Sequence, residues 1–201
     1  FEVGESAIVM GQGILGLLAI KELRAAGAMP IIAVDPVQTR RDFALKHGAD
    51  YALDCNDPDF VKKVKSLTGE GVKVAIEVTG FGHALDRVLD VVAPKGRVAL
   101  LGCTRDKNFT IDYYRKIHAP GITLVGAHTA ARPACDSYAG WWTDADEMAG
   151  ILNLQKGGRL DLQSIITEVH APQEAPEVYH RMLQEKEFPV GVQFDWSLLD
   201  T

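Results

Sequence analysis

The chain has 201 residues, of which 47% are hydrophobic and 24% are charged, and its formal net charge is −6. This composition is typical of a soluble globular protein and excludes disordered and collagen-like classes. No apolar run approaches the roughly 18 residues that a membrane-spanning helix needs. The acidic balance, without a basic cluster, also argues against nucleic acid as a partner.

The three cysteines, Cys55, Cys103 and Cys135, form no C-x-x-C pair, and their number is odd. Their spacing predicts neither a disulfide framework nor a zinc cluster, and it favours a reducing, cytoplasmic setting. The chain begins Phe-Glu-Val-Gly-Glu, without an initiator Met or a basic leader. We therefore expect a fragment of a longer protein.

Short runs of β-branched residues alternate with amphipathic stretches between residues 6 and 126. Apolar residues at i, i+3 and i+4 predict helices, the last of them from the spacing of Leu85, Val88, Leu89 and Val92. Right-handed crossovers between parallel strands then predict an α/β fold, a Rossmann doubly wound parallel sheet of order 3-2-1-4-5-6, over residues 1–128. The expected strands are 6–10, 30–35, 51–54, 73–78, 97–102 and 122–126, and the expected helices are 14–26, 37–47, 58–67 and 82–92.

The pattern changes in residues 129–201. Thr143 stands three residues before Asp146, so a helix is expected to begin there and to end near Gly157. Stretches 164–169 and 190–196 are typical of strands, but neither has an evident partner. We interpret residues 129–201 as a C-terminal α+β segment of an incomplete catalytic domain.

A G-x-G-x-x-G motif lies directly between the first predicted strand and the first predicted helix. Gly11 allows a tight turn, Gly13 lets the backbone approach a diphosphate, and Gly16 lets the helix pack closely. The N–H groups of Gly13, Ile14 and Leu15 are then expected to face an anion at the helix N-terminus. In this context the motif predicts a dinucleotide site.

Asp35 ends the second predicted strand, where an acidic side chain reaches the ribose hydroxyls of adenosine. A 2′-phosphate would be repelled by this carboxylate, so NAD is preferred over NADP. Arg40 and Arg41 leave an alternative, in which they hold a phosphate while Asp35 turns away. We favour a solvated helix face with one arginine along the adenine edge.

The ligand of such a sheet lies across the carboxyl ends of strands one and four. Val78 and Thr79 end the fourth predicted strand, while Leu101 and Gly102 end the fifth, so both ends are expected to line the nicotinamide half. Glu77 is an unusual charge within a buried strand. A structural hydrogen-bonding role is favoured for it over a catalytic one.

Together these segments resemble the coenzyme-binding domain of the zinc-type medium-chain dehydrogenase/reductase family, in its alcohol, sorbitol and threonine dehydrogenase branch. The resemblance implies hydride transfer between a secondary alcohol or polyol and NAD, with a catalytic zinc that polarises the alcohol oxygen. It rests on residues 4–10 running into the glycine loop and on Ala-Val-Asp at 33–35, Gly-Ala-Asp at 48–50, Glu-Val-Thr-Gly at 77–80, Lys-Gly-Arg-Val at 95–98 and Phe-Pro-Val-Gly at 188–191.

The resemblance also implies roles for single positions. Gly11, Gly13 and Gly16 match the loop that binds the diphosphate in the family. Asp35 matches the family's ribose acceptor, and Arg40 matches its basic residue beside adenosine. Leu101, Ala127 and Thr129 fall where backbone groups hold the nicotinamide carboxamide. Phe81 stands where the family often has an arginine that reaches the cofactor.

In the family, the zinc ligands and the proton relay come from a preceding domain, which residues 129–201 would complete. No counterpart of that domain is present, so this chain is expected to hold no catalytic residue and no metal ligand of its own. A metal pair of Cys103 and His128 is disfavoured because it lacks a third ligand. The predicted strand 122–126 resembles the edge through which family members associate, so a homodimer or homotetramer is expected.

Two alternative functions stay open. A zinc-free quinone or enone reductase of the same superfamily usually takes NADPH, and Asp35 argues against that choice. A module that senses NAD(H) without chemistry would be expected to carry a DNA-binding or gating element, which the acidic tail does not suggest.

Overall fold

The computed structural model describes residues 2–185 and 187–199. Contacts between residues divide the chain into two compact units, which meet in the sequence between Leu160 and Asp161. The predicted boundary between 128 and 129 stays a prediction. No helix in the described ranges is long and apolar enough to cross a membrane.

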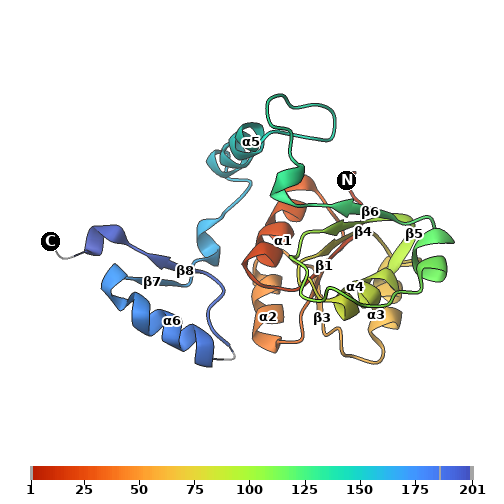
Figure 1. Ribbon diagram of the computed structural model, residues 1–201, viewed down its shortest axis with the longest axis horizontal. Helices are drawn as coiled ribbons and strands as arrows, with labels where there is room; N and C mark the ends of the chain where they lie inside the picture. The colour runs from red at the N-terminus through yellow and green to blue at the C-terminus, as the bar shows by residue number, and fades with distance from the viewer. Residues whose placement is uncertain (1, 186, 200–201) are drawn as a thin grey trace. The chain divides into compact units, whose positions relative to one another are not determined.

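The first unit is built on a six-stranded sheet of order β3-β2-β1-β4-β5-β6, with every pair parallel (Figure 1). In the central strand β1, Val9 is opposite Ala33 of β2 and Ile76 of β4. The predicted doubly wound sheet is thus confirmed, and its winding reverses between β1 and β4. The strands are β1 (Ala7–Met10), β2 (Ile31–Val34), β3 (Tyr51–Leu53), β4 (Val72–Glu77), β5 (Val92–Leu100) and β6 (Thr123–Gly126).

Crossover helices cover both faces of this sheet. Helices α1 (Ile14–Ala26) and α2 (Gln38–Lys46) lie on one face, and α3 (Phe60–Thr68) and α4 (Gly82–Leu89) lie on the other (Figure 1). Every residue of β1 and β2 is buried as a result, which explains their continuously apolar sequences.

The start of β5 differs from the prediction. Val92 was expected in the preceding helix, but α4 ends at Leu89 and Val92 pairs with Val72 of β4. Three consecutive buried residues, Val91, Val92 and Ala93, suit a strand covered on both faces and cannot all share one helix face. The register then shifts before Arg97 pairs with Val74, so the predicted strand 97–102 overlaps only the second half of β5.

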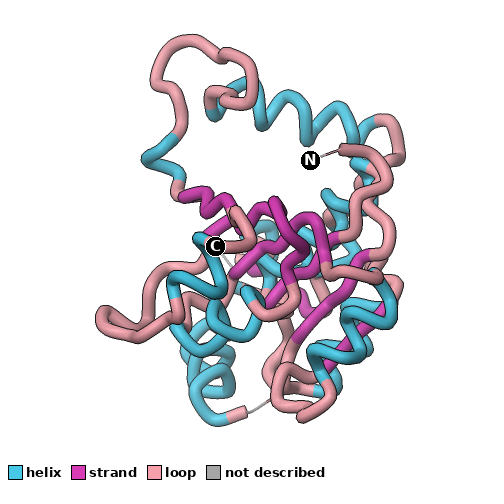
Figure 2. Tube along the Cα trace, turned by 90° about the vertical axis from the view of Figure 1, so that its right-hand side faces the viewer, coloured by secondary structure: helices cyan, strands magenta, loops and turns pink. Residues whose placement is uncertain are grey.

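A long loop after β6 leads to helix α5 (Asp144–Lys156) and is drawn as a pink arch in Figure 2. The hydroxyl of Thr143 accepts the N–H of Asp146 at 3.3 Å, and Gly157 follows the last turn, so both predicted helix ends are confirmed. Inside the loop, Tyr138 and Trp141 exchange two backbone hydrogen bonds of 2.8 Å.

The second unit holds a two-stranded parallel sheet of β7 (Glu168–His170) and β8 (Val192–Phe194), connected through α6 (Ala175–Gln184). The two strands that had no evident partner in the sequence therefore pair with each other. β7 begins later than predicted because the Asp161 carboxylate accepts the N–H groups of Gln163 and Ser164, which folds this stretch into a turn. β8 is also shorter than predicted, because a 3₁₀ turn begins at Trp196.

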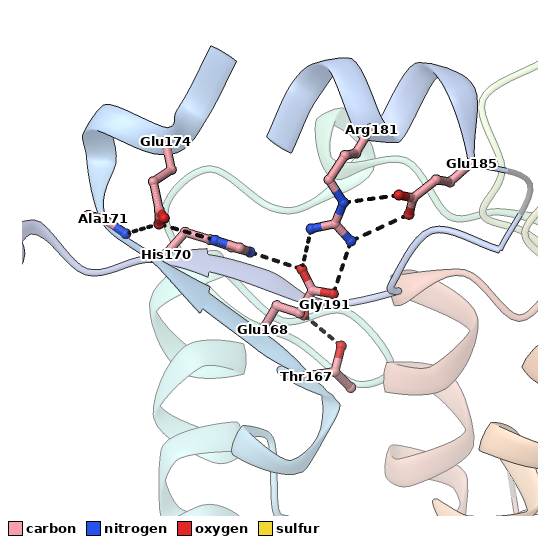
Figure 3. Close-up of polar contacts among 8 residues, drawn as sticks. All are labelled: Thr167, Glu168, His170, Ala171, Glu174, Arg181, Glu185 and Gly191. Atoms are coloured by element: carbon pink, nitrogen blue, oxygen red, sulfur yellow. Dashed lines mark hydrogen bonds and ion pairs between the residues drawn. The ribbon is translucent and has the colours of Figure 1, made fainter. Parts of the chain in front are cut away.

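A cluster of charged side chains ties α6 to β7 in this unit (Figure 3). Glu168 accepts two hydrogen bonds from Arg181, at 3.0 and 3.2 Å, and lies 2.9 Å from Nε2 of His170. Nδ1 of His170 lies 3.2 Å from Glu174. Because ionised carboxylates can only accept, a charged imidazole, which carries a proton on each ring nitrogen, can donate to both of them. The hydrogen bond to Glu168, and then the one to Glu174, raise the pKa of His170.

Candidate functional site

A cavity of about 690 Å³ lies at the carboxyl ends of β1, β2 and β4, a volume within the usual range of ligand pockets. Its wall combines the glycine loop after β1, the start of α2, the loop after β3 and the start of α4. The structure thereby brings together most of the predicted site residues. Those on the wall are Gly11, Gly13, Ile14, Leu15, Asp35, Arg40, Val78 and Thr79.

The three glycines of the loop meet different constraints. Gly11 has a φ of +98°, and a Cβ built on it would lie 2.8 Å from a methyl group of Thr79. A Cβ on Gly16 would approach the carbonyl oxygen of Gly11 closer than 3.0 Å, a separation that real Cβ atoms do not show. A Cβ on Gly13 would have no atom within 4 Å. The space beside Gly13 is therefore open to a ligand, while Gly16 is needed for packing although it does not line the cavity.

The N-terminus of α1 has no side-chain cap among the residues that the structure describes. Gly13 is the N-cap residue and offers no side chain, and the first turn contains no acidic residue. The first N–H groups of a helix have no acceptor within the helix, so those at Ile14 and Leu15 can serve an anion.

Asp35 is 3% exposed and joins two turns. One carboxylate oxygen accepts the N–H of Gln12 and the other accepts the N–H of Val37, both at 2.8 Å. Each oxygen has a second lone pair, so each can still accept a ribose hydroxyl. Recognition of ribose stays a prediction. Sequence reasoning did not find the second role, in which Asp35 holds the glycine loop against the start of α2.

The two neighbouring arginines differ in what they contact. Arg41 donates to the carbonyl oxygen of Asp35 at 2.6 Å and also to the side chain of Gln38. Arg40 lies on the cavity wall, 3.9 Å from the Asp35 carboxylate, and its buried Nε has no hydrogen-bond partner among the residues described. Arg40 is therefore the arginine with donors left for a ligand.

Glu77 is 3% exposed and fixes the turn between β4 and α4. Its carboxylate accepts the N–H of Thr79 at 2.8 Å and that of Gly80 at 3.0 Å, as well as the hydroxyl of Thr79. These bonds support the structural role favoured from the sequence.

Sequence reasoning missed several wall residues, among them Gln12, Cys55 and Asn56. Gln12 occupies a variable position of the motif, yet it is fully buried; its Nε2 donates to Val9 at 2.8 Å, and its Oε1 has no partner in the described ranges. Cys55 and Asn56 come from the loop after β3. Burial, and then Asp54, raise the pKa of the Cys55 thiol, so this part of the wall is uncharged. A polar residue between an apolar strand and an apolar helix was the one signal that could have identified Gln12.

The residues predicted at the nicotinamide half divide into two groups. Val78 and Thr79 line the cavity, whereas Leu101, Gly102, Ala127 and Thr129 do not. Leu101 and Ala127 follow the ends of β5 and β6, and the N–H of Ala127 donates to Leu100 at 3.1 Å. Gly102 is packed against the β4–α4 turn, where a Cβ would clash. Thr129 begins an exposed 3₁₀ turn.

Within residues 2–185 and 187–199, no three His, Cys, Asp or Glu side chains gather as a metal site. His128 accepts the N–H of Ala130 through Nδ1, at 3.0 Å.

Residues 15–141 match the family described as zinc-binding dehydrogenase. L-threonine 3-dehydrogenase from Pyrococcus horikoshii is 38% identical over 165 residues, which cover 82% of this chain and 44% of that protein. D-guloside 3-dehydrogenase from Escherichia coli is 30% identical over 196 residues, which cover 96% of this chain and 55% of that protein.

Solved structures show the same fold. 2R,3R-butanediol dehydrogenase from Bacillus subtilis has a TM-score of 0.77 at 26% identity, covering 96% of this chain and 51% of its own. Benzyl alcohol dehydrogenase from Acinetobacter calcoaceticus has a TM-score of 0.78 at 22% identity, and the match covers 93% of this chain and 49% of that protein. The chain thus spans about half the length of the relatives it matches.

Proposed function

Because the chain belongs to the zinc-binding dehydrogenase family, we propose that it forms the NAD(H)-binding portion of an alcohol or polyol dehydrogenase, which transfers hydride between a secondary alcohol and NAD. The observation that carries the proposal is the cavity whose wall joins an uncapped helix start to a buried acid, Asp35. The threonine, guloside and butanediol dehydrogenases among the relatives support an alcohol as the substrate class.

The residues present fit a dinucleotide. The open space beside Gly13 supports the approach of a phosphate to the N–H groups of Ile14 and Leu15, and the Asp35 carboxylate, with Arg40 beside it, supports a contact with the ribose hydroxyls. When bound, NAD supplies the acceptor for the hydride. The chain's own contribution is to bind and orient the coenzyme, and we propose that the ends of β5 and β6 hold its carboxamide.

Asp35 supports NAD over NADP. The alternative use of Arg40 for a 2′-phosphate requires this carboxylate to turn away, which would break its hydrogen bonds to Gln12 and Val37. With the carboxylate held in place, a phosphate about 4 Å away would be repelled by on the order of 1–4 kcal/mol.

Zinc does not fit the residues described, since no three of the ligand-forming side chains meet. No step of the reaction is therefore assigned to zinc in this chain.

We also propose that β6 mediates a homodimer or homotetramer. All four of its residues are exposed, including Leu124 at 38% and Val125 at 36%, and it is the last strand of the sheet. An apolar strand with one unpaired edge is a template for pairing with a second copy.

A thermal-shift titration tests coenzyme binding. NADH and NAD should raise the melting temperature at lower concentrations than NADPH and NADP, because a ligand that binds only the folded state stabilises it. Absence of any shift would refute the coenzyme site, and equal responses to both pairs would refute the role of Asp35.

A further inference from the structure

Arg105 lies in the loop after β5 and lines the cavity, although no sequence motif pointed to it. Its guanidinium makes no hydrogen bond and no ion pair within the described part of the chain. Every other arginine there has at least one polar or charged partner. An unpaired arginine on a cavity wall has its full donor capacity left for a ligand.

The loop that carries Arg105 is fixed to the start of α4. The N–H of Arg105 donates to the carbonyl oxygen of Gly80 at 2.7 Å, and the carboxylate of Asp106 accepts the N–H of Gly82 at 2.8 Å. The ring of Phe109 packs so closely on Gly82 that a Cβ there would clash with it. The backbone of Arg105 is therefore held beside the cavity by contacts that need no ligand.

The cavity has few other cations to offer a dianion. The glycine loop contains no basic residue, and Arg40 lies near the Asp35 carboxylate, which offsets its charge. Asp106, the acid next to Arg105, is already bonded to Gly82. An arginine fork matches phosphate oxygens in geometry and in charge.

We propose that the guanidinium of Arg105 pairs with the diphosphate of the dinucleotide in this cavity. This inference rests on the proposed coenzyme site and adds to it a binding residue from a separate loop. Phe81, which is uncharged and 44% exposed on the same wall, leaves the phosphate charge for Arg105 to neutralise.

The test measures the affinity of NADH, ADP and adenosine by titration calorimetry for the wild-type chain and for Arg105→Ala. Lys107→Ala is the matched control, because it removes the same charge from the same loop but does not line the cavity. We expect Arg105→Ala to lower the affinity for NADH and for ADP about tenfold or more, and to leave the affinity for adenosine within about twofold of the wild-type value. Lys107→Ala should change none of these three affinities by more than about twofold. Arg105→Lys should keep part of the affinity for NADH and ADP that Arg105→Ala loses.

The apo melting temperature of Arg105→Ala should match that of the wild type, because the side chain has no hydrogen bond or ion pair to lose among the described residues. Unchanged affinity for NADH and ADP would overturn the inference. Equal weakening of adenosine and ADP would also overturn it, because the contact would then be with the base or ribose. If the wild type binds neither NADH nor ADP, the proposed function itself fails, and the inference fails with it.

Discussion

Replacing Gly13 with alanine separates coenzyme binding from folding, because the structure leaves open space where the new methyl group would go. The backbone there is extended, with a φ of −77° that any residue adopts, and Gly13 makes no side-chain cap. We therefore expect Gly13→Ala to cost less than about 1 kcal/mol of stability in the absence of ligand. The same methyl group would occupy the space through which a phosphate reaches the N–H groups of α1.

Gly16→Ala is the contrasting variant in the same motif. Its Cβ would clash with the carbonyl oxygen of Gly11, so the start of α1 or the loop must shift. Such overpacking costs about 1–3 kcal/mol, and Gly16→Ala should melt several degrees below the wild type without ligand.

The assay is a melting curve with and without NADH. At a ligand concentration of about 100 Kd the wild type should gain about 2.7 kcal/mol, or about 5–10 °C for a chain of this size. Gly13→Ala should keep the apo melting temperature and lose most of this gain. The reasoning is refuted if Gly13→Ala shows the full gain with NADH, or if it melts as low as Gly16→Ala without ligand.

Three further predictions concern specificity, pH and assembly. Asp35→Ser should weaken the binding of NADH and shift the coenzyme preference toward NADPH by about tenfold, because Arg40 can then contact the 2′-phosphate. The loss of two hydrogen bonds to backbone N–H groups should lower the stability of the fold by about 1–3 kcal/mol. An unchanged coenzyme preference in a titration would contradict this prediction. The pKa of His170 is raised in the folded chain. Its ion pairs therefore stabilise the fold fully at pH values below the pKa of the unfolded chain, about 6.5, and this stabilisation is lost as the pH rises through the pKa of the folded chain. Proton NMR should show His170 titrating above pH 6.5, and its substitution by Gln should flatten the fall in stability over that window. Leu124→Lys should shift the molar mass in light scattering toward the monomer, and an unchanged assembly would remove β6 from the interface.

The sheet could be predicted because each strand carries its own signal. Strands buried on both faces are continuously apolar, and the alternation with amphipathic helices leaves few topologies open. The boundary between α4 and β5 could not be predicted, since a short apolar run fits both periods, and the pairing of Val92 with Val72 decides it.

The candidate site divides in the same way. The glycine loop and Asp35 have fixed spacing within one βαβ unit, so local sequence identifies them. Arg105 is held beside the cavity by its backbone bond to Gly80, 25 positions earlier in the chain, and Gln12 is fully buried although it occupies a variable position of the motif. Contacts of this kind depend on tertiary structure and leave no mark in the spacing of a single sequence.

The two buried acids, Asp35 and Glu77, each bond to backbone N–H groups of the turns that border the cavity. They set the shape of the binding crevice in the empty protein, so little backbone entropy is left for the coenzyme to remove on arrival. Association should consequently be fast and close to rigid-body, with the loss of freedom falling on the torsions of the dinucleotide.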